Sequence, residues 1–188
     1  MHTSQSELEQ GLEHVRRSPK DVGVIELIVC RPAIDERQAL AQAELDVATG
    51  LVGDNWLARG NRKREDGSAH PDMQLNLMNA RAIALIAQTP DRWRLAGDQF
   101  YVDLDLSYDN VPPGTRLKMG DDAVIEVTAE PHLGCAKFME RFGRDAARFV
   151  NSEVGKSLNL RGINARVLVP GKLQVGAPIS KLRPQPDG

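Results

Sequence analysis

The chain has 188 residues, 41% of them hydrophobic and 27% charged, which is ordinary for one soluble globular domain with a sizeable core. The formal net charge of -2 argues against partners held by bulk charge, such as nucleic acid or an anionic membrane. No apolar run approaches the roughly 20 residues that span a bilayer. The polar N-terminus lacks a signal peptide's apolar segment, so we expect a cytoplasmic protein.

The first predicted elements are a helix and two strands. Ser6 and Glu9 have the spacing of a capping box, and apolar residues then recur on one helical face, which predicts a short helix in an N-terminal arm of residues 1–21. A frayed arm is the alternative. The β-branched run of residues 22–30 predicts a buried strand, and the alternation over residues 42–48 predicts a second one.

A break in the pattern follows these strands. Gly50 and Gly53 bracket two apolar residues and precede Asp54, which indicates unusual backbone angles or the close approach of another group. A polar, basic loop comes next. Residues 73–78 then alternate as a strand, and Asn79 is placed to cap the helix that follows.

The second half of the chain adds strands and one long helical stretch. Residues 99–107 alternate as a strand, and residues 116–128 predict two strands joined by a turn. A helical stretch begins near Cys135, and three β segments lie between residues 163 and 182. We expect residues 183–188 to form a disordered tail.

This succession of elements defines the predicted fold class. Short strands separated by turns, with about three helices, predict an α+β, β-rich domain closed into a β-barrel with a few peripheral helices. We find no strand–helix–strand rhythm and no internal repeat. A single domain over residues 22–182 therefore accounts for the pattern.

Cys135 is the first candidate for chemistry. It stands at a predicted helix start, where unpaired N–H groups and partial positive charge stabilise a thiolate. Lys137 and Arg141 add local positive charge. The alternative for any lone cysteine is a small buried hydrophobe, and Cys30, at the end of an apolar strand, fits that description better.

Two histidines and a basic loop are weaker candidates. His132, three residues before Cys135, could be half of a metal site or a base beside a nucleophile. His70 is either a plain loop histidine or a ligand. The basic loop could clamp a phosphate, although a solvated surface loop is the simpler explanation. Its cations are Arg59, Arg62, Lys63 and Arg64.

The order of motifs along the chain resembles the MOSC domain, the module at the C-terminus of molybdenum-cofactor sulfurases that also occurs in stand-alone bacterial proteins. The resemblance covers roughly residues 22–182. The segments that carry it are GLVGD at residues 50–54, AGDQF at 96–100, VPPGTRLKMGDDAVIEVT at 111–128 followed by a lone cysteine, and GINARVLVPGKLQVGAPI at 162–179.

The resemblance implies a β-barrel with a pocket cysteine that carries sulfur or meets the molybdenum of a pterin-dithiolene cofactor. Cys135 matches that cysteine, and Gly53 and Asp54 match the family's Gly-x-x-Gly-Asp element. Gln99 stands where relatives usually show asparagine, and His132 stands where stand-alone relatives often show arginine.

We therefore expect a protein that binds the molybdenum cofactor. A thiolate is a soft ligand suited to a metal–sulfur centre, and a basic loop suits the cofactor's phosphate. Cys135 is the predicted metal ligand and, with His132, the predicted catalytic pair. The predicted cofactor-binding residues are Gly53, Asp54, Arg59, Arg62, Arg64, His70, Gln99 and Lys137.

Three functions remain open from the sequence. The first is an enzyme or carrier that uses Cys135 in sulfur transfer or in reducing N-hydroxylated compounds, with a redox partner protein. The second is a cofactor-binding module without turnover, and the third is a cysteine-dependent hydrolase with His132 as base. No aminotransferase-like domain is visible, so pyridoxal phosphate chemistry is not implied. The substrate and the oligomeric state are left open.

Overall fold

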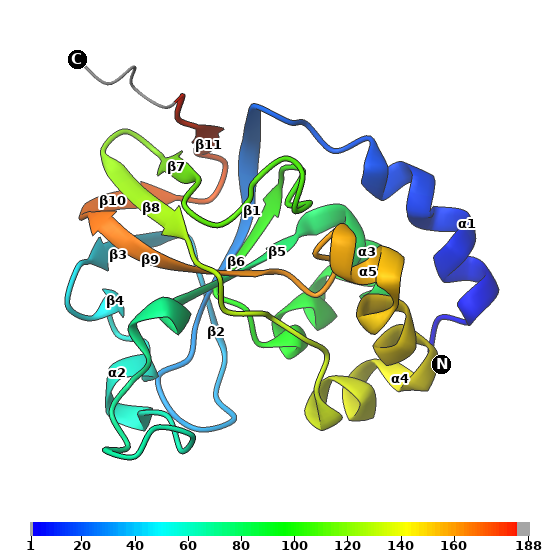
Figure 1. Cartoon of the computed structure of the whole chain (residues 1–188), viewed down its shortest axis with the longest axis horizontal. Coiled ribbons are helices and arrows are strands. Elements are labelled where there is room, and N and C mark those ends of the chain that lie inside the picture. The colour runs from blue at the N-terminus through cyan, green and yellow to red at the C-terminus, as the bar shows by residue number, and fades with distance from the viewer. Residues whose placement is uncertain (1, 184–188) are drawn as a thin grey trace.

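The computed structural model describes residues 2–183 and confirms the predicted closed barrel (Figure 1). Seven strands pair in the order β1-β6-β5-β9-β8-β7-β11, and the pairing of β11 with β1 closes the ring. β2 extends β1 beyond the ring, and β10, β3 and β4 form a second, three-stranded sheet. The strands are β1 (Val22–Cys30), β2 (Gln38–Leu40), β3 (Gln42–Asp46), β4 (Gly50–Leu51), β5 (Leu75–Asn79), β6 (Phe100–Asp103), β7 (Arg116–Met119), β8 (Ala123–Val127), β9 (Ile163–Val169), β10 (Gly171–Gln174) and β11 (Pro178–Lys181).

The helices lie outside the barrel. Three longer ones match the predicted number, and α2 is a short addition that the sequence pattern did not reveal. The helical stretch predicted from Cys135 onward is divided at Ser152 into α4 and the short α5. Figure 1 shows α1, α3, α4 and α5 gathered on one side of the barrel, away from α2. The helical elements are α1 (Gln5–Arg16), α2 (Trp56–Arg59), η1 (Pro71–Met73), α3 (Ala80–Ala87), η2 (Pro90–Ala96), α4 (Ala136–Asn151) and α5 (Glu153–Ser157).

The start of the first helix differs from the prediction. The capping box is formed by Ser4 and Glu7 instead of Ser6 and Glu9, so α1 begins earlier along the chain. The helix is not a frayed arm, because its apolar face, including the fully buried Leu8, packs against α3 and α4. The predicted tail lies outside the described residues from residue 184 onward.

One pairing corrects the expectation that strand–helix–strand units are absent. β5 and β6 are parallel neighbours, and α3 crosses between them. Parallel strands require such a crossover, which is commonly helical. Asn79 ends β5 and caps α3 as predicted, because its side chain accepts a hydrogen bond from the backbone N–H of Ala82.

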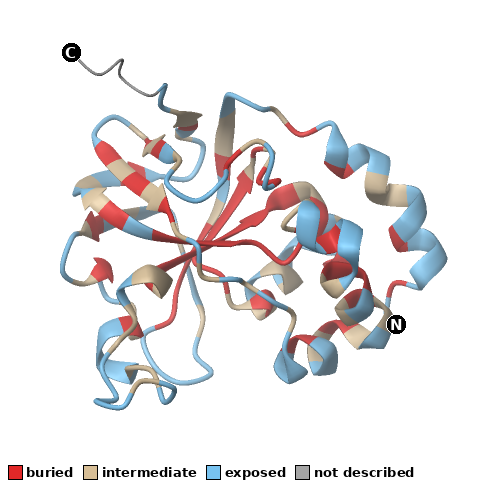
Figure 2. Ribbon diagram, viewed as in Figure 1, coloured by how far each residue is buried: buried red, intermediate tan, exposed pale blue. Residues whose placement is uncertain are grey.

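Two apolar clusters stabilise this arrangement. One fills the barrel, where every second residue of a strand points inward, and the other lies between the barrel's outer wall and α1, α3 and α4. Figure 2 shows the strands buried at the centre and the helices exposed on their outer faces. None of the helices within residues 2–183 is long and apolar enough to cross a membrane.

Candidate functional site

A cationic cavity of about 770 Å³ opens between the end of β1, α2 with its basic loop, and the start of α4. Two histidines, His70 and His132, also line it, and no carboxylate does. The cavity therefore favours an anionic or acceptor-rich ligand. Its cationic residues are Arg31, Arg59, Arg62, Lys137 and Arg161.

Arg31 is fixed in the wall by a buried carboxylate. Its Nε and Nη2 donate to the two oxygens of Asp54, each at 2.9 Å, and Nη1 donates to Asn76 and to the carbonyl of Gly97. Asp54 also accepts the backbone N–H of Arg31, and its side chain is fully buried. Asp54 thus positions a cavity arginine and does not itself line the cavity.

A second buried group joins two cavity residues. His132 Nε2 lies 2.7 Å from Asp98 Oδ1, and Arg161 Nη1 donates to Asp98 Oδ2 at 2.6 Å. Arg161 Nη2 donates to the carbonyl of Ala96, and the guanidinium lies over the ring of Phe138. The carboxylate of Asp98, which follows η2, therefore links the loop before α4, through His132, to the residues before β9, through Arg161.

The charge states within this group follow from its surroundings. Burial alone would raise the pKa of Asp98, but the charge of Arg161, the charge that His132 carries when protonated and the hydrogen bonds from both residues outweigh it and lower the pKa to about 2. Burial, and next the charge of Arg161, lower the pKa of His132 against the opposing effect of Asp98. Asp98 is therefore ionised and His132 is neutral near pH 7.

We expect the protein to become less stable as the pH is lowered, because of His132 and Asp98. The unfolded chain protonates His132 near the usual pKa of 6.5, above the native pKa, so stability is lost as pH falls through 6.5. Asp98 adds a second loss between 3.8 and about 2. Urea unfolding at several pH values checks this. His132→Gln should remove the first loss, and a wild-type protein equally stable at about pH 7 and pH 5 would contradict the prediction.

Cys135 lies at the entrance of α4, as the sequence predicted. It is the N-cap residue, is exposed, and makes no side-chain capping hydrogen bond. His132 and Lys137 on either side of it line the cavity, whereas Cys135 is not in the wall. Lys137 and Arg141 both pair with Asp35, so their charge is shared with a carboxylate.

The expected pair of Cys135 and His132 is not hydrogen-bonded. No hydrogen bond joins the two side chains within the described residues, and His132 Nε2 contacts Asp98 instead. No group of three His, Cys, Asp or Glu residues in residues 2–183 could hold a metal ion by itself. The structure thus offers neither a cysteine–histidine dyad nor a protein-only metal cage.

Only two of the four cationic side chains of the basic loop line the cavity. Arg59 and Arg62 line the cavity and have no carboxylate partner among residues 2–183. Lys63 and Arg64 do not line it, and Arg64 Nε is bound to Asp66 and Ser68.

The remaining predicted residues have different surroundings. His70 lines the cavity while its Nδ1 accepts the backbone N–H of Asp72. Gly53 has a φ of +86°, which favours glycine. Gln99 is fully buried and bonds to Asn76 and Gln74, so it is a core residue and not part of the cavity wall.

Three important residues escaped the sequence analysis. Arg31 follows an apolar strand directly, Asp98 lies in the AGDQF segment, and Arg161 precedes β9. Each is an isolated charge beside a buried element, and only Asp98 had a further signal, its place in a segment that carries the MOSC resemblance. Burial of such charges normally requires a partner, but the partner's identity depends on the folded chain.

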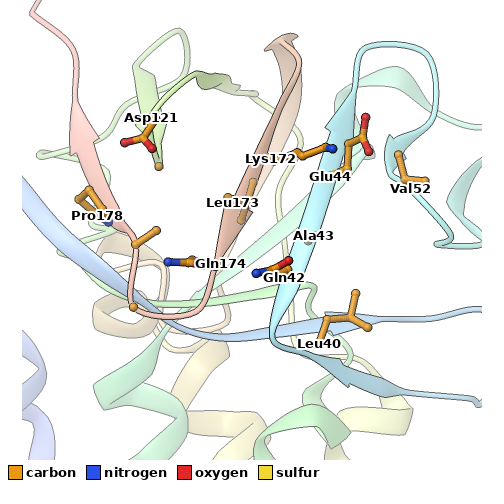
Figure 3. A pocket seen from close by; sticks show the side chains of 13 residues that line it. Leu40, Gln42, Ala43, Glu44, Val52, Asp121, Lys172, Leu173, Gln174 and Pro178 are labelled. Carbon is orange, nitrogen blue, oxygen red and sulfur yellow. The ribbon is translucent and has the colours of Figure 1, made fainter.

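A second cavity of equal volume lies at the three-stranded sheet (Figure 3). Its wall includes Glu44, Lys172 and Asp121, together with apolar residues such as Leu40 and Pro178. The charges are of mixed sign, and none of the predicted site residues lines it. The cationic cavity is therefore the candidate site.

The chain is similar to one known domain family and to several solved structures. The family model of the MOSC domain matches residues 64–180, and no curated protein matches. YuaD of Bacillus subtilis is 15% identical with a TM-score of 0.57, over 84% of this chain and 94% of that one. YiiM of Escherichia coli is 21% identical with a TM-score of 0.54, over 87% of this chain and 72% of that one. YiiM of Geobacillus stearothermophilus is 16% identical with a TM-score of 0.52, over 88% of this chain and 75% of that one. These likenesses show a shared fold.

Proposed function

Because this chain belongs to the MOSC domain family, which is associated with molybdenum-cofactor binding, we propose that it binds that cofactor in the cationic cavity and presents Cys135 to the molybdenum. The activity we propose is sulfur transfer or the reduction of N-hydroxylated compounds. The observation that carries the proposal is the cavity wall, which has five cationic side chains and no carboxylate.

The donor set fits this cofactor. The metal of a pterin-dithiolene cofactor already carries sulfur ligands, so the chain needs to supply only one more donor. An exposed thiol at a helix N-terminus is a suitable soft donor. In addition, Arg161 Nε is a buried donor in the cavity wall without a partner in residues 2–183, which suits an acceptor-rich ligand.

Each part of the chain has a distinct task in this proposal. Arg59 and Arg62 are free to bind the phosphate, while Arg31 is held rigidly by Asp54 as a fixed positive charge. The partial charge at the N-terminus of α4 favours the thiolate of Cys135. When bound, the cofactor would supply the electron-transfer or sulfur-transfer chemistry.

Neutralising the free arginines should weaken binding of a phosphorylated pterin. We expect Arg59→Gln/Arg62→Gln to raise Kd by roughly tenfold or more, because a hydrogen bond to a charged group contributes about 1.5–3 kcal/mol. Calorimetry at two salt concentrations measures this, and added salt should weaken wild-type binding. Arg64→Gln is the matched control, since Arg64 pairs with Asp66 and lies outside the wall. Equal affinities in all three proteins would contradict a phosphate role for the loop.

Metal analysis of protein from a cofactor-sufficient host tests the proposed function directly. Molybdenum bound to the chain, with turnover of an N-hydroxylated base or sulfur transfer, supports the enzyme. Tight binding without turnover supports the non-catalytic module instead. A protein that takes up no molybdenum under loading conditions would contradict the proposal. The hydrolase alternative gains no support, because Cys135 and His132 make no hydrogen bond.

A further inference from the structure

We infer that His132 is a hydrogen-bond acceptor in the wall of the cationic cavity, held by Asp98 so that its other ring nitrogen, Nδ1, accepts a hydrogen bond from an N–H or O–H group of the ligand. The ligand's identity as an N-hydroxylated base rests on the proposed function. The arrangement of His132, Asp98 and Arg161 does not depend on that function. The NMR and binding experiments below do not depend on it either.

The hydrogen-bond partners fix which ring nitrogen carries the proton. Asp98 is fully buried, and one of its oxygens is occupied by Arg161 at 2.6 Å. An ionised carboxylate can only accept hydrogen bonds, so the contact of 2.7 Å to His132 requires a hydrogen on Nε2. In the neutral ring this leaves a lone pair on Nδ1.

That nitrogen is open for a ligand. His132 lines the cationic cavity and also two smaller cavities beside it, and its side chain is 15% exposed. Nδ1 makes no hydrogen bond to residues 2–183, and it is not among the buried polar atoms that lack a partner. It therefore remains accessible, in contrast to Nδ1 of His70, which accepts the backbone N–H of Asp72.

The charges around the ring keep it neutral. Burial and the positive charges of Arg161 and Arg31 lower the pKa of His132, and only Asp98 opposes them. His132 thus places an uncharged acceptor among arginine and lysine side chains that can only donate. The cavity selects a ligand that combines anionic or acceptor groups with one hydrogen-bond donor.

An N-hydroxyl group meets this requirement. Its O–H group donates a hydrogen bond to Nδ1 and keeps its proton, because the lowered pKa of His132 makes the ring a weak base. Asp98, which is bonded to Nε2, holds the ring in the tautomer that accepts this hydrogen bond.

The tautomer is tested on the protein without cofactor. Nitrogen NMR of labelled histidines should show His132 neutral and protonated on Nε2 at about pH 7, with its signal assigned by its loss in His132→Gln. Addition of an N-hydroxylated base should move the Nδ1 signal. A ring protonated on Nδ1, a charged ring, or an unmoved signal with bound ligand would overturn the inference.

The role toward the ligand is tested by comparing an N-hydroxylated base with its O-methyl ether, which has no donor on oxygen. Wild type should bind the free hydroxyl about fivefold tighter, because a hydrogen bond contributes about 1 kcal/mol. His132→Phe should lose that preference. His132→Gln keeps an acceptor, so it should retain most of the preference.

The controls separate this inference from the proposed function. His14→Gln, on the exposed face of α1, should match wild type in every measurement. If wild type takes up no molybdenum, the proposed function fails, but the NMR and binding comparisons still decide the role of His132. If molybdenum binds normally and His132→Phe keeps the wild-type preference, only the inference on His132 fails.

Discussion

Cys135→Ser is expected to abolish molybdenum uptake and every cofactor-dependent activity while leaving the fold intact. Serine has nearly the size of cysteine but lacks the soft, easily ionised sulfur donor. The side chain of Cys135 is exposed and makes no capping hydrogen bond, so the free energy of unfolding should change by about 0.5 kcal/mol or less. Molybdenum per chain, absorbance and turnover should be measured on wild type and variant loaded in parallel.

Cys30→Ser is the matched control for this substitution. Cys30 is only 5% exposed, and burial raises the pKa of its thiol, so it should react with an alkylating agent more slowly than Cys135. The serine variant should keep its molybdenum but lose about 1–3 kcal/mol of stability, because a hydroxyl enters an apolar core. A Cys135→Ser protein with full activity, or faster labelling of Cys30, would contradict the assignment.

Asp98→Ala is expected to have the largest effect on stability, about 3–5 kcal/mol of the free energy of unfolding. The substitution leaves the guanidinium of Arg161 buried without a counter-charge, and it removes the partner of His132 Nε2. Urea unfolding measures the loss. A decrease below about 1 kcal/mol would show that water or a rearranged side chain replaces the carboxylate.

Two further variants test whether a buried unpaired charge causes the loss of stability in Asp98→Ala. Asp103→Ala breaks the contact with Arg81, whose side chain is partly exposed, and should cost about 1 kcal/mol or less. Asp98→Ala/Arg161→Met removes both buried charges, so it should be more stable than Asp98→Ala alone. If the double variant is no more stable, an unpaired charge is not the cause of the loss.

The barrel was predictable from the sequence because its strands carry their own signals. The alternation in residues 99–107 gives β6 its inward face, and the turn at Gly120 separates β7 from β8. The parallel pairing of β5 and β6 was missed because strand direction depends on the chain's path and not on local periodicity. α2 was missed because four residues are too few to establish a helical period.

The candidate site was only partly predictable. Cys135 was found because a helix start is a local property of the sequence. Asp98, the partner of His132, lies 34 residues away in sequence, so no local pattern reveals the pair. The basic loop was recognised as a unit, but the direction of each side chain depends on local turns. Arg64 is held by Asp66 and Ser68, which removes it from the cavity.

The closure of the barrel also sets the order in which the protein can fold. Val22 of β1 pairs with Ser180 of β11, so the ring cannot close until most of the chain has been synthesised. Contacts between such distant residues carry a high loop-closure entropy and slow the folding of β-rich domains. Until then, the edges of β1 and β7 that β11 later covers are open to pairing with another chain. Folding intermediates that lack β11 should therefore be the species most prone to aggregation.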